Sequence, residues 1–547
     1  MRTVIVGGVA GGMSAATRLR RLDEQAEIIV IERSGYVSFA NCGLPYYVGG
    51  VIEERAALLL QTPQSLAARF GIDVRVLTEV VGIDAAAHTI TVREVGSEHT
   101  VELDYDFLVL SPGARPVRPP IPGIERALSL RDIEDTDAMA AAVGQAGSAV
   151  VIGGGFIGLE VAGNLHHKGI VTTIVEAADQ VMAPLDPEMV SPVHAALRDA
   201  GIDLRLGAGV ASIDADTVTL TDGSTVPADV VIAAIGVRPD VSLAQAAGLT
   251  IGAKGGVLVD EVHLTSDPHI YAVGDAVEKK DALDGSSALV PLANTANLQG
   301  RRVADHICGL PGTGRGVLGT AIVGLLGLQI ATTGWNEKRL RAAGRAYRAI
   351  HTHPMSHAGY YPGAEPMALK LLVDPDTDEI LGAQGIGREG VDRRIDVIAT
   401  AITGGIKAAA LADLELAYAP AFSSAKDPVN MLGYIDDNLV QGTAETVQWH
   451  ELDGALDAGA HLVDVRSVTE FDAGSIPGAI NIPLDELRSR LAELPDGELV
   501  VHCAVGQRGH TAARLLRQHG RSVRNLDGGY RTWAAGRSTR VPETVAK

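Results

Sequence analysis

The chain has 547 residues and a formal net charge of -21 at pH 7, with 46% hydrophobic and only 4% aromatic residues. This length predicts about three or four domains, and the composition is typical of an α/β protein rather than a disordered or fibrous one. The negative charge argues against nucleic acid and against an anionic membrane surface as partners. The apolar stretch 321–330 is far shorter than the about 20 residues a membrane-spanning helix needs, so we expect no membrane span.

The cysteine count points to a reducing compartment. The chain contains three cysteines, Cys42, Cys308 and Cys503, which are too few for a disulfide framework. The N-terminus passes directly from Met1-Arg2-Thr3 into an apolar strand pattern, which leaves no room for a signal peptide. We therefore expect a cytoplasmic protein.

The first predicted elements follow the order of a dinucleotide-binding unit. A strand at 3–6 runs into a glycine-rich loop, a helix follows to residue 22, and a second strand at 27–31 ends at Glu32. In such units glycines let the backbone approach a pyrophosphate at the helix N-terminus, and the acidic residue accepts from a ribose hydroxyl. Val9 stands where the middle glycine is expected, so an ordinary strand-to-helix turn is the alternative. The predicted cofactor-binding residues are Gly7, Val9, Ala10, Gly11, Gly12, Glu32 and Arg33.

A second copy of the same unit follows. The strand 149–152 leads into a complete G-x-G-x-x-G loop, then a helix to about residue 168 and a strand at 171–175 that ends at Glu176. Two such units predict two bound dinucleotides. A carboxylate at Glu176 would repel a 2′-phosphate, so we expect NADH to bind better than NADPH. NADPH is the alternative cofactor. The predicted cofactor-binding residues here are Gly153, Gly155, Gly158 and Glu176.

Three further segments, Asp106–Ala114, Asp229–Pro239 and Thr265–Asp275, match one family in its own order. With the two glycine loops, they make residues 1–440 resemble the FAD-dependent pyridine nucleotide–disulfide oxidoreductases. The resemblance implies FAD in the first unit, with Asp275 on the flavin ribityl chain, and NAD(P)H in the second. It also implies an α/β fold with two Rossmann-like domains and an α+β dimerisation domain. The expected ranges are 1–115 and 245–325 for FAD binding, 116–244 for NAD(P)H binding and 326–440 for dimerisation.

Cys42 lies in Ser38-Phe39-Ala40-Asn41-Cys42-Gly43-Leu44-Pro45-Tyr46, without the second cysteine that most of the superfamily has nearby. This pattern resembles the single-cysteine branch, which contains coenzyme A disulfide reductases, persulfide reductases, and NADH oxidases or peroxidases. Pro45 indicates a helix that begins close to the sulfur, where the helix dipole would lower the thiol pKa. We therefore expect a catalytic thiolate at Cys42. A buried cysteine acting as a small hydrophobe is the alternative, and that is the role we assign to Cys308.

Basic and aromatic residues extend the resemblance to the coenzyme A branch. In relatives, residues at the positions of Arg18, Arg21, Ser38 and Asn41 contact coenzyme A, whose phosphates suit guanidinium donors. An exposed basic helix face is the alternative for the two arginines.

The branch also supplies two tyrosines from the partner subunit of a dimer, and Tyr360 and Tyr418 occupy the matching segments. A phenol beside the substrate sulfur could donate a proton to a leaving thiolate. We expect a homodimer with both tyrosines in the catalytic site, packing being the alternative for Tyr360. His351, His353 and His357 could suggest a metal. No cysteine or carboxylate completes a site, and we assign none.

After Tyr434 the pattern changes, and the polar residues 435–443 suggest a linker. Residues 445–547 resemble a rhodanese domain, in the strands 461–466 and 498–502, the turn 474–483 and the end 527–533. The six-residue loop Cys503-Ala504-Val505-Gly506-Gln507-Arg508, followed by a helix at 511–519, has the length typical of that family. We expect backbone N–H groups and Arg508 to stabilise a thiolate or persulfide at Cys503.

These features predict a flavoprotein reductase fused to a sulfurtransferase. NADH would reduce coenzyme A disulfide, coenzyme A persulfide or a polysulfide through Cys42, with Cys503 handling sulfane sulfur, and release coenzyme A thiol and sulfide. One alternative is an NADH oxidase or peroxidase in which Cys42 cycles through sulfenic acid. Another is a sulfur carrier or redox sensor without turnover.

Overall fold

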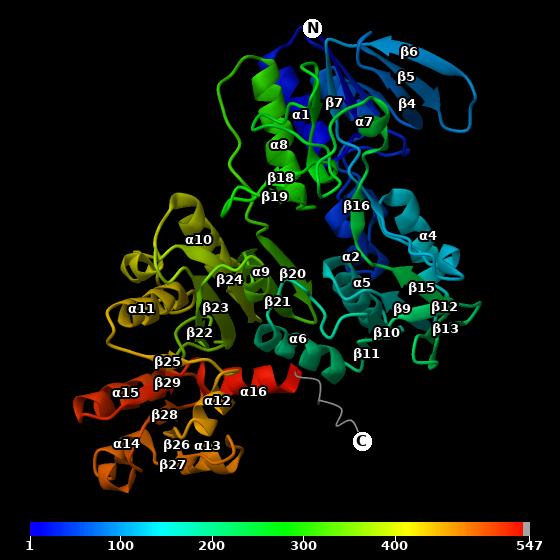
Figure 1. Cartoon of the computed structure of the whole chain (residues 1–547). Helices are drawn as coiled ribbons and strands as arrows, with labels where there is room; N and C mark the ends of the chain where they lie inside the picture. The colour runs from blue at the N-terminus through cyan, green and yellow to red at the C-terminus, as the bar shows by residue number, and fades with distance from the viewer. Residues whose placement is uncertain (540–547) are drawn as a thin grey trace. The chain divides into compact units, whose positions relative to one another are not determined.

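The computed structural model describes residues 1–539 (Figure 1). This part of the chain separates into two compact units. Unit 1 contains residues 1–178 and 202–319, and unit 2 contains residues 179–201 together with the chain from residue 320 onward. Within the described residues, no helix is long and apolar enough to cross a membrane.

The first sheet of unit 1 is parallel, with strand order β17-β7-β1-β2-β3. Its central strands are runs of buried aliphatic residues, as expected when helices or further chain cover both faces of a parallel sheet. Two helices that pack against each other lie on it, and Gly300 comes so close to Gly11 that a Cβ there would meet the Gly11 carbonyl oxygen at 2.1 Å. The elements are β1 (Arg2–Val6), β2 (Glu27–Ile31), β3 (Asp73–Arg75), β7 (Phe107–Leu110), β17 (Ile270–Ala272), α1 (Ala10–Leu22) and α8 (Ala293–Ile307).

The second sheet of unit 1 is also parallel, with order β11-β10-β9-β15. It consists of β9 (Ser148–Ile152), β10 (Val171–Glu176), β11 (Asp203–Leu206) and β15 (Val230–Ala233), and α5 (Phe156–His167) connects its first two strands. The chain passes between the two sheets through the antiparallel pair β8 (Ala114–Pro116) and β16 (Val237–Pro239). The remaining elements of unit 1 are α2 (Leu44–Val48), α3 (Pro63–Phe70), α4 (Ile133–Val143), α7 (Ser242–Ala246), β4 (Thr78–Asp84), β5 (Thr89–Glu94), β6 (Thr100–Asp104), β12 (Val210–Ile213), β13 (Thr217–Leu220), β14 (Thr225–Pro227), β18 (Lys279–Lys280) and β19 (Ser287–Ala288).

Unit 2 begins with an antiparallel sheet of order β20-β21-β24-β23-β22, on which two helices pack through a shared apolar core. One further helix, α6 (Pro187–Asp199), comes from inside the range 116–244 expected for NAD(P)H binding and packs in unit 2. The other elements are β20 (Ala321–Leu325), β21 (Leu328–Gly334), β22 (Arg348–Thr352), β23 (Met367–Val373), β24 (Ile380–Gly387), α9 (Glu337–Ala342), α10 (Val391–Gly404) and α11 (Pro428–Val440).

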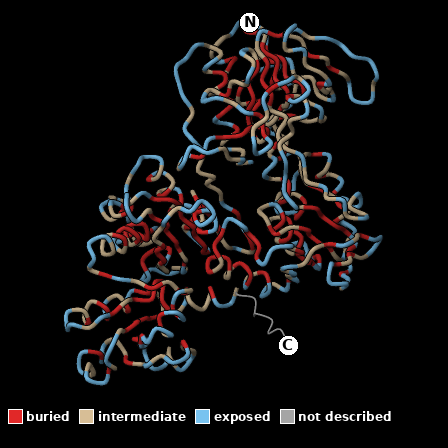
Figure 2. Tube along the Cα trace, viewed as in Figure 1, coloured by how far each residue is buried: buried red, intermediate tan, exposed pale blue. Residues whose placement is uncertain are grey.

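The last part of unit 2 is a parallel sheet of order β25-β29-β28-β26-β27 with its own apolar cores. Figure 2 shows the buried residues concentrated in the sheets, with exposed residues on the loops and outer helices. The elements are β25 (Thr446–Val447), β26 (His461–Asp464), β27 (Ile480–Asn481), β28 (Leu499–His502), β29 (Val523–Leu526), α12 (Leu452–Asp457), α13 (Val468–Asp472), α14 (Leu484–Leu487), α15 (Gln507–Gln518) and α16 (Gly529–Thr539). Residues 540–547 of the range expected for the rhodanese domain lie outside the described residues.

Two local expectations from the sequence are wrong. Residues 435–440, expected as linker, continue α11, because Ile435 and Leu439 pack on the core that also buries Leu432. The helix expected at 511–519 begins at Gln507, directly after Gly506, whose φ is 90°. The turn that precedes the helix therefore contains only residues 503–506, which we call the Cys503 loop.

Candidate functional site

The first glycine loop has contacts that only glycine allows. Gly7 has a φ of 101°, and a Cβ there would lie 2.1 Å from the Ser111 carbonyl oxygen. A Cβ at Gly12 would lie 1.9 Å from the Gly7 carbonyl oxygen. Val9 and Ala10 form the start of α1, so the missing middle glycine does not disturb the strand–loop–helix order. The loop therefore brings the N-terminus of α1 to the end of β1, as a dinucleotide site requires.

Glu32 ties the end of β2 to this loop. Its carboxylate accepts from the backbone N–H of Gly8 and of Ser34, both at 2.8 Å, and burial raises its pKa. Arg33 follows at the exposed end of the strand. Asp275 lies in the segment after β17, and Val273 of that segment contacts the loop at Gly11. Glu32 and Asp275 thus come from separate segments that converge on one loop.

The second glycine loop repeats this geometry. A Cβ at Gly153 would lie 2.4 Å from the Ala234 carbonyl oxygen, and one at Gly158 would lie 2.0 Å from that of Gly153. A Cβ at Gly155 would meet nothing within 4 Å, which leaves open space beside the backbone. Glu176 accepts from the N–H of Gly154 at 2.7 Å, as Glu32 does in the first unit.

Cys42 lies in a short turn immediately before α2 and is exposed. Among residues 1–539, its one hydrogen-bond contact is weak, from Sγ to Asn41 Oδ1 at 3.9 Å. The expected lowering of its pKa by the helix is wrong. Although the residue is exposed, surrounding protein atoms partly desolvate the sulfur and raise its pKa, and the charges of Glu160 and Asp275 raise it further. The helix α2 is also only five residues long, so its dipole is small.

Three residues close to Cys42 or to Asp275 were missed by the sequence reasoning. Tyr46 donates its hydroxyl to Glu160 Oε1 at 3.2 Å, and burial together with the Glu160 charge raises the pKa of Tyr46 to about 12. Lys279 neighbours Asp275, and burial lowers the pKa of Lys279 to about 8. Glu160 stands two residues after Gly158 on α5, and that position after a glycine loop was the one available signal.

A groove of about 460 Å³ collects basic side chains from α1 and α8. Arg18 and Arg21 line it as neighbours, and Arg18 Nε also pairs with Asp305 Oδ1 at 2.6 Å. The other predicted contacts, Ser38 and Asn41, are not part of this lining. Ser38 has a φ of 48° and Asn41 adjoins Cys42. The full lining is Ser14, Thr17, Arg18, Arg21, Asn294, Asn297, Leu298 and Arg301.

In unit 2, the fold brings the two predicted tyrosines together. The hydroxyls of Tyr360 and Tyr418 lie 3.0 Å apart although 58 residues separate them in the chain. Both are exposed, Tyr360 by 77%. Two phenols hydrogen-bonded on an open surface are available to a second chain.

Cys503 follows β28 and is fully buried, at the base of the Cys503 loop. Arg508, expected in the loop, lies in the first turn of α15 and forms a bidentate pair with Glu470 at 2.7 and 2.8 Å. This pair lowers the pKa of Glu470 to about 2 and raises the pKa of Arg508, to which Cys503 also contributes. Arg508 therefore faces both Glu470 and Cys503.

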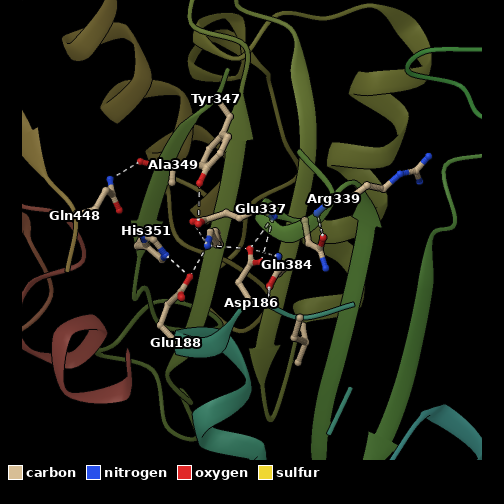
Figure 3. A network of polar contacts seen from close by, with 12 residues as sticks. Asp186, Glu188, Glu337, Arg339, Tyr347, Ala349, His351, Gln384 and Gln448 are labelled. Atoms are coloured by element: carbon tan, nitrogen blue, oxygen red, sulfur yellow. Dashed lines mark hydrogen bonds and ion pairs between the residues drawn. The ribbon is translucent and has the colours of Figure 1, made fainter. Parts of the chain in front are cut away.

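The histidines were expected to have no nearby carboxylate, and this is wrong for His351. Its Nδ1 lies 2.6 Å from Asp527 Oδ2 and its Nε2 lies 3.0 Å from Glu188 Oε1. Within the part of the chain that the structure describes, one carboxylate cluster has ligand-like geometry, Asp186, Glu188 and Glu337. Figure 3 labels these three carboxylates, and the ammonium of Lys370 contacts all of them. The positive charge within this carboxylate cluster thus comes from Lys370 of the chain itself.

Comparison with known proteins identifies each part of the chain. Residues 1–300 match the family described as pyridine nucleotide-disulphide oxidoreductase, residues 320–428 match the dimerisation domain of that family, and residues 448–536 match the rhodanese-like domain. A coenzyme A disulfide reductase of Staphylococcus epidermidis is 33% identical over 436 residues, which are 79% of this chain and 99% of that protein.

Two solved structures resemble nearly the whole chain. The reduced CoADR-RHD of Bacillus anthracis is 49% identical, with a TM-score of 0.97 and coverage of 98% of both chains. An NAD-dependent persulfide reductase from A. fulgidus is 38% identical, with a TM-score of 0.91 and coverage of 97% of this chain and 100% of its own. Both similarities extend beyond residue 440.

Proposed function

Because this chain belongs to the pyridine nucleotide-disulphide oxidoreductase family, we propose that it reduces coenzyme A disulfide, coenzyme A persulfide or a related polysulfide with NADH through the thiol of Cys42. The observation that carries the proposal is the position of Cys42. The sulfur interacts with Glu160, on the helix that starts at the second glycine loop, and with Asp275, on the segment that contacts the first loop. The proximity of one thiol to residues of both segments supports electron transfer between the two proposed dinucleotide sites and this sulfur.

The first glycine loop fits FAD and the second fits NADH. Gly7 and Gly12 keep the first loop free of side chains, Glu32 would accept from the ribose, and Asp275 would hold the ribityl chain. The open space beside Gly155 suits the pyrophosphate of the second dinucleotide. When bound, FAD supplies a two-electron relay between NADH and a sulfur atom.

The residues of this chain account for the sulfur chemistry. The Cys42 thiolate attacks one sulfur of the substrate, a new S–S bond forms on Sγ, and the original S–S bond breaks to release a thiolate that takes up a proton. No second cysteine stands near Cys42 in the sequence, since the other two cysteines are Cys308 and Cys503. The overall change for a persulfide is that NADH, a proton and coenzyme A persulfide yield NAD⁺, coenzyme A and hydrogen sulfide.

Coenzyme A would bind in the basic groove. Arg18, Arg21 and Arg301 offer guanidinium groups suited to its phosphates. Ser38 and Asn41 lie on the segment that leads from the glycine loop to Cys42 and would contact the pantetheine arm.

We also propose a homodimer in which Tyr360 and Tyr418 of one chain serve the Cys42 of the other. Their exposure and mutual hydrogen bond support this arrangement, and so does the match of residues 320–428 to a dimerisation domain. A tyrosine hydroxyl is a suitable donor to the leaving thiolate.

Cys503 would receive sulfane sulfur before coenzyme A ferries it to Cys42. The thiol lies at a strand end before a helix, with Arg508 nearby, as a persulfide anion requires. The persulfide reductase of A. fulgidus shares this extended architecture.

The deciding experiment compares steady-state NADH oxidation with coenzyme A disulfide, coenzyme A persulfide, polysulfide, peroxide and oxygen. We expect faster NADH oxidation with the sulfur substrates than with peroxide or oxygen. We expect Cys42→Ser to retain FAD but to lose all of these reductions, because an alcohol is a far weaker nucleophile than a thiolate. Cys503→Ser should lose sulfane-sulfur transfer and keep the reduction of coenzyme A disulfide. Rapid turnover with peroxide alone, or full turnover by flavin-loaded Cys42→Ser, would contradict the proposal.

A further inference from the structure

A tight turn at residues 527–529 joins two parts of unit 2. It connects β29 to α16, and Gly528 and Gly529 have φ values of 66° and 63°. A Cβ at Gly528 would lie 2.8 Å from the Cβ of His351 on β22. A Cβ at Gly529 would lie 2.5 Å from the carbonyl oxygen of Cys503. The backbone of this turn therefore touches β22 on one side and the Cys503 loop on the other.

The turn also holds the Cys503 loop through hydrogen bonds. The N–H of Tyr530 donates to the carbonyl of Cys503 at 2.8 Å, and that of Arg531 donates to Ala504 at 3.0 Å. The side-chain amide of Asn525 donates to the carbonyl of Gly506 at 3.1 Å. Residues on both sides of Asp527 thus fix three carbonyls of the loop.

His351 fixes the turn through Asp527. The carboxylate of Asp527 accepts from the ring Nδ1–H of His351 at 2.6 Å and from its backbone N–H at 3.0 Å. The opposite ring nitrogen donates to Glu188 at 3.0 Å. All three residues are buried, so the ring has one orientation in which both of its N–H groups are satisfied.

The partner of His351 is itself immobilised. Glu188 also accepts from Lys370 on β23 and from the indole of Trp449 at 3.2 Å. Lys370 is fully buried and lies 2.9 Å from Asp186 and 2.6 Å from Glu337. We call these six residues, Asp186, Glu188, Glu337, His351, Lys370 and Asp527, the buried ionic network (Figure 3 labels Asp186, Glu188, Glu337 and His351).

From these contacts we propose that His351 is a positioning residue for the Cys503 loop, which it controls through Asp527. The proposal rests on the role of Cys503 proposed above. His351 does not touch the sulfur. It holds the turn whose next residues fix the loop. His351 lies on β22, within residues 320–428, which match a dimerisation domain. A strand of one domain thus sets the geometry in which the thiol of another domain reacts.

The two ring nitrogens allow a matched pair of variants. The amide nitrogen of asparagine can take the place of Nδ1, whereas that of glutamine can take the place of Nε2. His351→Asn therefore retains a donor for Asp527 and loses the one for Glu188, and His351→Gln does the reverse. Both remove the same charge from the network. A general loss of stability should affect them alike.

The assay uses the full-length holoenzyme and follows single-turnover sulfur transfer, with thiosulfate and in a second series with glutathione persulfide. In this step the donor S–S bond breaks, its outer sulfur forms a persulfide on Cys503, and sulfite or glutathione leaves. We expect His351→Gln to lower the maximal rate by about tenfold or more, a loss of about 1.4 kcal/mol or more in barrier terms, with little change in half-saturation. His351→Asn should retain most of the rate.

Ser191→Ala is the control, because it removes a different contact of α16, the 2.7 Å hydrogen bond to Ser538. It should leave the rate unchanged. Equal losses in the two His351 variants, or none in either, would overturn the positioning role while leaving the function of Cys503 intact. Absence of sulfur transfer in the unaltered chain with both donors would overturn the role of Cys503 and, with it, the positioning role. Tryptophan fluorescence checks that each variant is folded.

Discussion

At Cys42 the charged groups of the chain oppose ionisation of the thiol. Burial raises the pKa of Cys42, and Glu160 and Asp275 add negative charge near the sulfur. Glu160 itself has a raised pKa because it is buried, and Tyr46 donates to it. A thiol in this setting is held mostly protonated until a substrate or cofactor changes the local field.

We therefore expect Glu160→Gln to lower the pKa of Cys42, since it removes a negative charge and keeps an acceptor for Tyr46. The measurement is the pH dependence of iodoacetamide alkylation in an FAD-loaded Cys308→Ala/Cys503→Ser background. Alkylation near pH 8 should become faster in the variant. A profile that does not move, or that shifts to higher pH, would exclude Glu160 as a control on the thiol.

Glu176 sets a second expectation at the residue scale. Its carboxylate is fixed by the N–H groups of Gly154 and Ala178, so it cannot turn away from a 2′-phosphate at low cost. NADH should exceed NADPH by about tenfold or more in kcat/KM, or about 1.4 kcal/mol. Glu176→Ala should reduce the ratio of kcat/KM with NADH to kcat/KM with NADPH. Equal use of the two cofactors by the unaltered chain would refute this role.

At the scale of elements, the buried ionic network joins α6, α9, β22 and β23 to the turn after β29. Its carboxylates, Asp186, Glu188, Glu337 and Asp527, outnumber its cations, Lys370 and His351, although Arg341 also pairs with Glu337. Burial alone would lower the pKa of His351, but Asp527 and then Glu188 raise it to about 9. His351 is therefore charged at neutral pH, and its charge holds Asp527 and Glu188 together.

This raised pKa predicts alkaline destabilisation. The stabilisation from charged His351 is fully present below its ordinary value of 6.5 and is lost as pH rises through about 9. All three tryptophans, Trp335, Trp449 and Trp533, lie in unit 2, so their fluorescence reports its melting. The midpoint temperature of melting should decrease as the pH rises from 6.5 to 9. This decrease should be smaller in His351→Gln. The same slope in the variant would assign the effect to another group.

At the scale of the whole molecule, the proposed site needs two chains. The chain presents Cys42 in unit 1 and the hydrogen-bonded Tyr360 and Tyr418 in unit 2, and a two-fold interface would pair one chain's cysteine with the other's tyrosines. The exposure of both tyrosines leaves them free for such a contact.

Subunit mixing tests this arrangement. Cys42→Ser and Tyr360→Phe/Tyr418→Phe should each be nearly inactive, yet an equal mixture should recover about a quarter of the normal turnover, because about half of the dimers are mixed and each has one intact site. Native mass spectrometry verifies that mixed dimers have formed. If verified mixed dimers stay inactive, the tyrosines serve a cysteine of their own chain or none.

The sequence alone determined the parts that depend on local backbone chemistry. Each of these parts is recognisable because a short run of residue types has one conformational use. They are the two glycine loops with Glu32 and Glu176, the single thiol at Cys42 and the turn that begins at Cys503. The same local signals placed the strands expected at 3–6, 27–31, 149–152 and 171–175 within one residue of β1, β2, β9 and β10. They failed for the end of α11. Ile435 and Leu439 pack on a core there, but the polar residues around them in the sequence gave no sign of it.

Only the tertiary structure decided which distant charges meet. Glu160 approaches Cys42 across more than a hundred residues of chain, and Asp527 reaches His351 across 176. Neither pair has a sequence spacing that predicts contact, since each depends on how separate strands and helices are layered. Lys370 is a charged residue in an otherwise apolar strand, which the local pattern does not explain. The three carboxylates around it in the structure do explain it. Burial removes water from such groups, so their partners are chosen by the fold as a whole.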